Sequence, residues 1–228
     1  MRNGSYKDIR KKVFRAAFDV RMRRMINIRA LLRRTIRKSK APAFLAAMMV
    51  VLNGCYLPIF FDAEIEITRA GYFKMIFDGY LTKVELFDQL RKNEITAAEE
   101  KEQIEVIRTD FTRSTSTKVF EYKNKGRFRV NWVREGDLTK VKTVTFYRRN
   151  ENMLGISYNS KTGLIGVNGR SMTRDVRQRL ADMGLAMRGE IRVITDAPVL
   201  RHNATKVKRN RSRGPNFKTY TWKIANIF

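Results

Sequence analysis

The sequence predicts an α+β fold: mostly antiparallel β-sheet with two or three helices packed on it, preceded by an N-terminal signal helix. Short segments rich in β-branched and aromatic residues recur between turn residues, as in a sheet of hairpins. Only two longer segments show the apolar period of an amphipathic helix. Near the start of the chain, a short apolar run follows a long basic arm, an order typical of export signals.

The apolar run, residues 41–52, has the length of a signal sequence and falls short of the ~20 residues that span a bilayer. It ends in Leu52, Asn53 and Gly54, directly before Cys55, the only cysteine of the chain. The basic arm holds the N-terminus on the cytoplasmic side, and the small Gly54 gives a peptidase access to the backbone. The thiol of Cys55 can then accept a diacylglycerol.

These four residues resemble the lipobox of bacterial cell-envelope lipoproteins. Leu52 and Gly54 match that pattern, whereas Asn53 stands where Ala, Ser or Thr is usual. The resemblance implies cleavage before the cysteine. Residues 1–54 are then a basic leader and signal peptide, and residues 55–228 are a single mature domain.

The basic arm is long, and translation from Met22 or Met25 would leave a leader of ordinary length. Two other structures remain open for the apolar run: an uncleaved membrane anchor, or a core helix beside an inert buried cysteine. Acylation of Cys55 would place the domain on the periplasmic face of a membrane, as a protein of the cell envelope. Tyr56 follows where Asp would favour the inner membrane of enteric bacteria, so we expect the outer membrane.

The chain contains 48 Lys and Arg against 22 Asp and Glu, a net charge of +26. The leader holds 15 basic and 2 acidic residues, so half of the excess belongs to the export signal. The mature domain keeps the other half, and one basic cluster comprises Lys206, Lys208, Arg209, Arg211 and Arg213. Such a surface suits anionic lipid, glycolipid or an envelope protein as the partner. Export removes most nucleic acids as partners, so we expect none.

A hairpin opens the mature domain. Residues 61–67 alternate apolar and charged side chains, Gly71 ends a turn, and residues 72–81 return as the second strand. A short helical piece is expected at residues 84–90.

Two longer helices have start or stop signals. Thr96 and Glu99 have the spacing of a capping box, and the helix that they open ends near Arg113. The second helix covers residues 172–183 and stops at Gly184, a residue type that favours helix C-caps. Each helix has an apolar stripe suited to packing on a sheet.

The rest of the domain is predicted to be strands separated by turn residues. We expect strands at residues 118–122, 127–133, 141–147, 154–158 and 164–167. Their regular spacing predicts consecutive antiparallel hairpins rather than βαβ units. Two further strands, at residues 189–195 and 219–224, are expected to close the domain. Residues 206–216 are expected to form a basic loop between the last two strands.

No catalytic constellation emerges from the sequence. One cysteine excludes a disulfide within the chain, and one cysteine with one histidine argues against a zinc site. Cys55 and His202 could pair as a nucleophile and base, but an acylated cysteine has no free thiol, and a turn position explains the histidine. Gly163, Gly166 and Gly169 are spaced loosely like a phosphate loop but lack its Lys-Ser/Thr, so we interpret them as turn residues.

Two further patterns allow either a binding role or a structural one. Asp62, Glu64 and Glu66 alternate along one strand and could bind a cation, although a solvated strand face is commoner. Phe128 and Trp132 lie among basic residues and could stack single-stranded bases. Their period favours the core instead.

The C-terminal part resembles the end of LppM-type bacterial lipoprotein domains. The matching segments are Gly189-Glu-Ile-Arg-Val-Ile-Thr-Asp196, then His202-Asn203, then Tyr220-Thr-Trp222. In those domains a strand leads through a short loop to an Asn, followed by a strand with an aromatic-x-Trp motif. The resemblance implies an anchored α+β domain in contact with lipids or glycolipids, without catalytic residues.

We therefore expect a non-enzymatic, lipid-anchored envelope protein that presents a basic β-rich domain to a lipid, a glycan or a protein partner, without a metal or cofactor. Two alternatives remain open. A basic cytoplasmic protein bound to nucleic acid or ribosomes would bury residues 41–52 as a helix and bind RNA in a salt-dependent way. An envelope enzyme would join distant carboxylates, such as Asp62 and Asp196, in one cleft.

Overall fold

The structure, a computed structural model, describes residues 56–147 and 153–227. These residues belong to one compact unit, Leu52–Phe228. The predicted leader and the predicted anchor at Cys55 lie outside the described residues. Within residues 56–147 and 153–227, no helix is both long enough and apolar enough to cross a bilayer.

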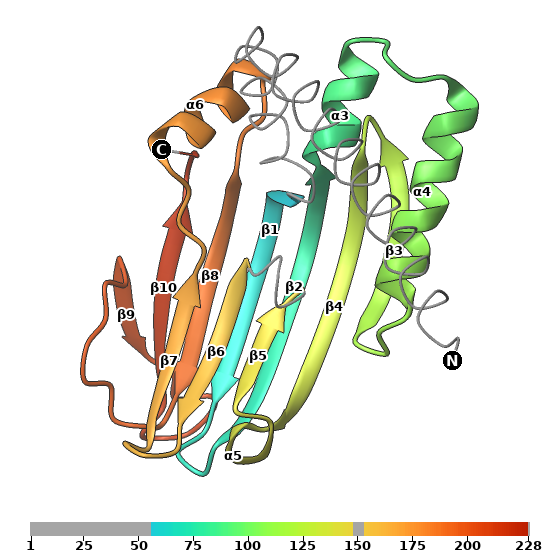
Figure 1. Cartoon of the computed structure of the whole chain (residues 1–228). Helices are drawn as coiled ribbons and strands as arrows, with labels where there is room; N and C mark the ends of the chain where they lie inside the picture. Colours follow the sequence, from blue (N-terminus) through green and yellow to red (C-terminus); the bar gives the residue numbers. More distant parts are fainter. Residues whose placement is uncertain (1–55, 148–152, 228) are drawn as a thin grey trace, which may run out of the picture. The chain divides into compact units, whose positions relative to one another are not determined.

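The described residues form ten strands and four helices, which confirms a mixed fold dominated by antiparallel strands (Figure 1). The strands are β1 (Tyr56–Ile67), β2 (Tyr72–Lys83), β3 (Thr117–Asn124), β4 (Arg127–Asp137), β5 (Thr143–Phe146), β6 (Leu154–Asn159), β7 (Leu164–Gly169), β8 (Arg188–Thr195), β9 (Lys206–Arg209) and β10 (Lys218–Ile224). The helices are α3 (Val84–Arg91), α4 (Ala97–Thr112), α5 (Leu138–Val141) and α6 (Arg174–Asp182).

Seven strands form one large sheet in the order β3-β4-β2-β1-β8-β10-β9, and β5, β6 and β7 form a smaller sheet. β1 and β2 pair as the predicted hairpin. The hairpins expected between residues 118 and 167 are confirmed for β3 with β4, β5 with β6 and β6 with β7, which all pair antiparallel. One pairing was not predicted, because β1 and β8 run parallel. These two strands are far apart in the chain, and local turn signals say nothing about such a pairing.

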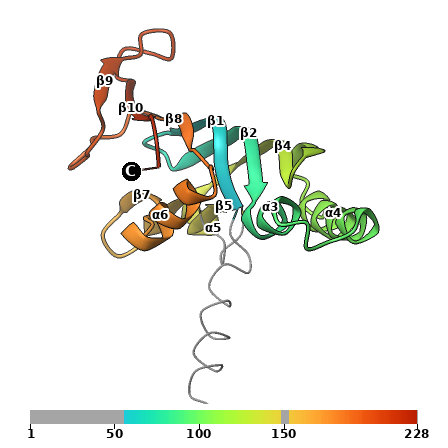
Figure 2. The ribbon, with the colours of Figure 1, turned by 90° about the horizontal axis from the view of Figure 1, so that it is seen from above.

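The smaller sheet and helices α3, α4 and α6 lie on one side of the large sheet (Figure 2). Both layers contribute to the main core, in which Ile65, Met75 and Trp132 of the large sheet join Phe111 of α4 and Phe146 of β5. The opposite face of the large sheet holds the charged residues Asp62, Glu64 and Glu66 of β1 and Lys74 and Asp78 of β2. This one-sided covering explains the alternation of buried and more exposed residues along β2 and most of β1.

The predicted capping box opens α4. Thr96 Oγ1 accepts a hydrogen bond from the backbone N–H of Glu99 at 3.3 Å, and Glu99 Oε2 accepts one from the backbone N–H of Thr96 at 2.8 Å. Ile104, Ile107 and Phe111 form the buried stripe of this helix. The helix start is therefore set by residues that are neighbours in sequence.

The other two predicted helices are also present. α3 is the short helical piece, and α6 lies within the segment predicted at residues 172–183. Thr173 caps the start of α6, and Leu180 is its buried residue. Gly184 follows the helix at φ +76°, the left-handed conformation that favours glycine.

Three segments differ from the prediction. The strand expected at residues 141–147 is divided between the end of α5 and β5. The basic loop expected at residues 206–216 begins with a strand, β9, whose residues are all exposed and so lack the apolar alternation of a recognisable strand. Gly166 and Gly169 lie in β7, so of the three spaced glycines only Gly163 is in a turn.

Candidate functional site

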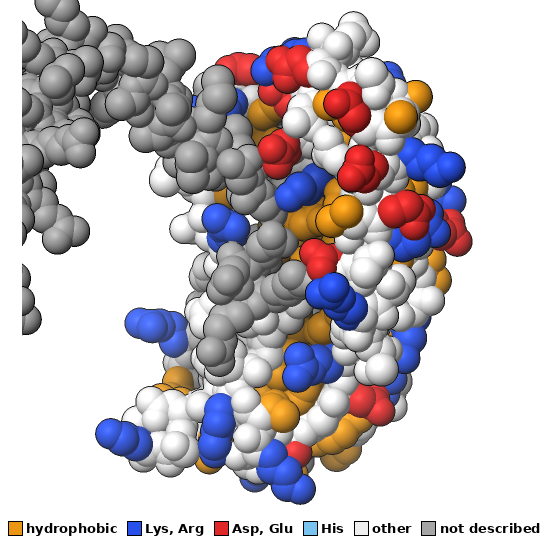
Figure 3. Space-filling view, turned by 45° about the vertical axis from the view of Figure 1, so that its right-hand side comes forward, with side chains coloured by type: hydrophobic (Ala, Val, Ile, Leu, Met, Phe, Trp, Pro, Cys, Tyr) orange, Lys and Arg blue, Asp and Glu red, His pale blue; other side chains and the backbone are white. Residues whose placement is uncertain are grey.

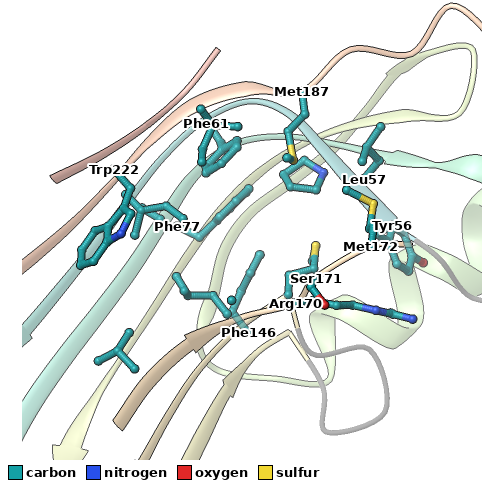
Figure 4. Close-up of a pocket in the computed structure, with 18 of the residues that line it drawn as sticks. Tyr56, Leu57, Phe61, Phe77, Phe146, Arg170, Ser171, Met172, Met187 and Trp222 are labelled. Atoms are coloured by element: carbon teal, nitrogen blue, oxygen red, sulfur yellow. The ribbon is translucent and has the colours of Figure 1, made fainter. Parts of the chain in front are cut away.

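A cavity of ≈380 Å³ lies between the large sheet and the smaller sheet (Figure 4). Strands β1, β2, β8 and β10 supply one wall, and β5, β6 and β7 supply most of the other. The segments that flank α6 complete the lining. The lining residues are Tyr56, Leu57, Pro58, Phe61, Ala63, Phe77, Phe146, Met153, Leu154, Val167, Gly169, Arg170, Ser171, Met172, Met187, Ile191, Val193, Asn203, Trp222 and Ile224.

Apolar and aromatic side chains make up most of this lining, and Phe77 and Phe146 are buried within it. Among the described lining residues, Arg170 is the only charged one, and Ser171 and Asn203 add short polar side chains. No Asp, Glu, His or Cys is among these described residues. Because each buried Å² of apolar surface contributes roughly 25 cal/mol, such a space favours the hydrocarbon part of a ligand.

Three aromatic rings connect the two sheets along one side of the cavity. The ring centroids of Phe61 and Phe77 lie 5.7 Å apart in a stacked arrangement, and those of Phe77 and Phe146 lie 4.2 Å apart. Trp132 meets Phe146 edge-on at 5.2 Å. Stacked and edge-on pairs of this kind add about 0.5–1.5 kcal/mol each beyond simple burial, so they hold this wall in place.

Phe61 reaches the cavity beside two glycines. It lies at an irregularity in β1, where the register with β2 shifts between Pro58 and Phe61. Its partners on the neighbouring strands are Gly79 of β2 and Gly189 of β8. A Cβ at Gly79 would lie 2.4 Å from the Phe60 carbonyl oxygen. A Cβ at Gly189 would lie 2.4 Å from the Phe61 carbonyl oxygen and 2.6 Å from its ring, so both positions need glycine.

The cavity has two different sides. Figure 4 shows Trp222 on one side and Tyr56, Met172 and Arg170 on the other. The Trp222 indole N–H donates a hydrogen bond to Asn203 Oδ1 at 2.9 Å, which fixes the ring. Arg170 is exposed, so the apolar interior has a charged edge on the side of Tyr56.

Three half-buried methionines, Met153, Met172 and Met187, line the cavity. Methionine is unbranched and polarisable, so its side chain follows irregular or flexible apolar partners. Two of them, Met172 and Met187, come from the segments on either side of α6. This part of the lining can therefore adapt to a chain-like ligand.

The acidic row of β1 forms ion pairs rather than a metal site. Arg192 of β8 donates hydrogen bonds to Glu190 at 2.9 Å, Asp62 at 3.2 Å and Glu64 at 3.3 Å. The hydrogen bond to Glu190, together with the Glu64 and Asp62 carboxylates, raises the pKa of the Arg192 guanidinium. Within the described part of the chain, no three His, Cys, Asp or Glu side chains are placed to share a metal ion.

The predicted basic cluster is exposed on β9 and the turn that follows it. Arg213 of this cluster pairs with Glu66 at 3.2 Å, so part of its charge is neutralised. β9 is an edge strand of the large sheet, where basic residues prevent pairing with further strands. On the face shown in Figure 3, Lys and Arg side chains are interspersed with Asp and Glu.

His202 has a local structural role. Its Nδ1 accepts a hydrogen bond from the backbone N–H of Ala204 at 3.3 Å, and its ring lies edge-on to Tyr220 at 4.9 Å. These contacts support the turn interpretation of His202. Cys55 and the three residues before it lie outside the described residues, so the lipid anchor stays a prediction.

The residues of the alternative functions also have structural partners. Asp196 Oδ1 accepts a hydrogen bond from the backbone N–H of Arg69 at 2.7 Å, and neither Asp196 nor Asp62 lines the cavity. Phe128 and Trp132 are buried, as predicted, so their rings are not available to stack on bases. The cavity is therefore the strongest candidate site.

Sequence patterns do not reveal this cavity, because its lining comes from seven strands and the loops beside them. Gly79 and Gly189, which interrupt otherwise regular strands, are the one local signal of a close approach there. Comparison of the chain with models of known families, with curated proteins and with solved structures finds no match. The functional interpretation rests on the chemistry of the lining.

Proposed function

We propose that this chain is a non-enzymatic, lipid-anchored protein of the cell envelope whose domain binds the acyl chain of an amphiphilic lipid between its two sheets. The observation that supports this most is the apolar cavity of ≈380 Å³. That volume is near the lower end of the usual range for ligand pockets, about 300–1,000 Å³. It suits one hydrocarbon chain better than a lipid with two.

The chemistry of the lining supports binding without catalysis. The interior presents aromatic rings and aliphatic side chains, and the lining residues that the structure describes include no Asp, Glu, His or Cys that could act as an acid, base or strong nucleophile. The three methionines favour a flexible ligand. A hydrocarbon chain meets both conditions.

The predicted anchor would attach beside this site. Tyr56, the residue after Cys55, is the first residue of β1 and lines the cavity. Acyl chains on Cys55 would hold the mouth near the periplasmic face of a membrane, with the outer membrane as our expectation. An amphiphile could then pass between membrane and cavity over a short distance.

Photo-crosslinking in a Gram-negative host tests both parts of the proposal. The cells are grown with a palmitate analogue that contains an alkyne and a photoreactive diazirine. Label that forms without irradiation reports acylation, and it should disappear in Cys55→Ala, with Cys55 as the N-terminus of the wild type. Label that requires irradiation reports binding, and we expect it on peptides from residues 56–63 and 164–172.

Two cavity-filling variants and one control make the binding test specific. Val167→Trp and Ala63→Leu add volume to the lining, whereas Ala98→Leu adds it on the exposed surface of α4. Irradiation-dependent label should fall several-fold in the first two variants and persist in the third. Equal label in all three would contradict acyl-chain binding in the cavity.

Chain length gives an independent measure. Buried methylenes contribute ~0.8 kcal/mol each, so the affinity of a competing fatty acid for the cavity should fall about fourfold for each methylene removed. Competition that does not depend on length would contradict the proposal. If residues 41–54 are retained and no label forms, salt-dependent retention of RNA becomes the next measurement.

A further inference from the structure

We propose that the cavity selects amphiphiles with an anionic head group, which binds to a rim of two cations, Arg170 and Lys83. This inference rests on the proposed function, because it names the ligand class of the same cavity. It also assigns a binding role to two basic residues outside the basic cluster of β9.

Arg170 is the central residue of this rim. It follows directly after β7 and is the only charged residue in the described part of the lining. Its backbone N–H donates a hydrogen bond to the Met153 carbonyl oxygen at 3.1 Å, which fixes the main chain there. The side chain is exposed and forms no ion pair with any described residue. Its guanidinium donors are therefore available to a ligand.

Lys83 lies at the end of the large sheet where β1 begins. It is the cross-strand partner of Tyr56, and its Nζ lies 5.0 Å from the centroid of the Tyr56 ring, which lines the cavity. Among the described residues, Lys83 has no ion-pair partner, unlike Arg192 and Arg213 on the outer face.

This arrangement matches an amphiphile with a negative head group. The hydrocarbon chain would occupy the apolar interior, and the head group would remain at the rim in contact with water. A carboxylate or phosphate accepts two parallel hydrogen bonds from a guanidinium, and charge-assisted bonds of this kind are roughly twice as strong as neutral ones. No carboxylate among the described lining residues competes for Arg170. A neutral head group would gain only the weaker bonds, and a cationic one would be repelled.

The test compares head groups on one chain length. Purified wild-type protein is anchored in phosphatidylcholine vesicles at mildly alkaline pH, and diazirine-labelled hexadecanoic acid is compared with the matching hexadecanol. We expect irradiation-dependent labelling by the acid at about tenfold lower probe concentration than by the alcohol. Hexadecyl phosphate as a competitor distinguishes a phosphate from a carboxylate as the preferred head group, and either preference supports an anionic ligand.

Charge variants test the rim itself. The double variant Arg170→Gln and Lys83→Gln should lose most of the preference for the acid while the alcohol still labels the cavity. Lys140→Gln with Lys161→Gln removes the same charge from exposed positions outside the lining and should keep the preference.

Each contrary outcome has a separate meaning. Equal labelling by acid and alcohol in the wild type overturns the inference but leaves acyl-chain binding intact. A preference that survives in Arg170→Gln with Lys83→Gln overturns the assignment to these cations. Irradiation-dependent labelling by neither probe overturns the proposed function as well.

Discussion

Replacement of Gly189 by alanine tests how the fold places Phe61 in the cavity. Gly189 is the partner of Phe61 on the parallel neighbour strand. The added methyl carbon would lie 2.4 Å from the Phe61 carbonyl oxygen and 2.6 Å from two ring carbons. Favourable contacts between carbon atoms occur at ≈3.5–4.0 Å, so the substitution forces a movement.

Two effects of opposite sign determine the result. Alanine in a strand interior is ordinarily more stable than glycine by roughly 0.5–1 kcal/mol, because glycine loses more conformational entropy on folding. Here the ring can rotate away, but the carbonyl oxygen belongs to the backbone, so β1 and β8 must separate. Overpacking costs typically about 1–3 kcal/mol. We therefore expect a net loss of about 1–2 kcal/mol in the free energy of unfolding.

Equilibrium unfolding in urea, followed by tryptophan fluorescence, measures this loss. Gly169→Ala is the matched control, because it is also a strand glycine and its added methyl would have no neighbour nearer than 3.9 Å. The control should be neutral or slightly more stable. In a Phe61→Ala background the penalty at Gly189 should shrink but remain, since the carbonyl contact persists without the ring.

The stability of Gly189→Ala can contradict this explanation. If Gly189→Ala is as stable as the wild type, or no less stable than Gly169→Ala, then the close approach to Phe61 is not what requires glycine there. In that case the placement of the Phe61 ring in the cavity needs another explanation.

Two further predictions concern single hydrogen-bonded pairs. Burial and the hydrogen bond from Tyr122 to Glu100 raise the pKa of Tyr122 to about 12, above its ordinary value of about 10. A raised pKa stabilises the fold below the unfolded value and loses that effect as the pH rises through the folded one. Between about pH 10 and pH 12 the wild type should therefore lose about 1–2 kcal/mol more stability than Tyr122→Phe, in urea titrations at both pH values. Thr96→Ala removes the side-chain cap of α4 and should cost about 1 kcal/mol by the same assay, and no loss would show that the capping box is dispensable.

Local structure could be predicted because its causes lie within a few residues of each other. The capping box of Thr96 and Glu99 sets the start of α4 from a spacing of three residues. The burial of Phe128 and Trp132 follows from the two-residue period of a strand with one covered face. The hairpin of β1 and β2 follows from two alternating segments around Gly71.

Strand order could not be predicted in the same way. β1 and β8 pair in parallel although a large part of the chain separates them, and β9 has no apolar face to indicate a strand. Such pairings depend on which surfaces are left uncovered after the local elements form. That information belongs to the assembled layers.

The sequence by itself determined the helix caps, most strand positions and the core aromatics, and it predicts the anchor at Cys55. Only the tertiary structure decided that two sheets leave an apolar cavity between them, that Gly79 and Gly189 admit Phe61 to its wall, and that Arg170 stands at its edge. Periodicity reports which face of an element is apolar. Whether the apolar faces of two layers meet in full contact or enclose a space depends on side-chain volumes contributed by distant strands, and that becomes defined only when the layers pack.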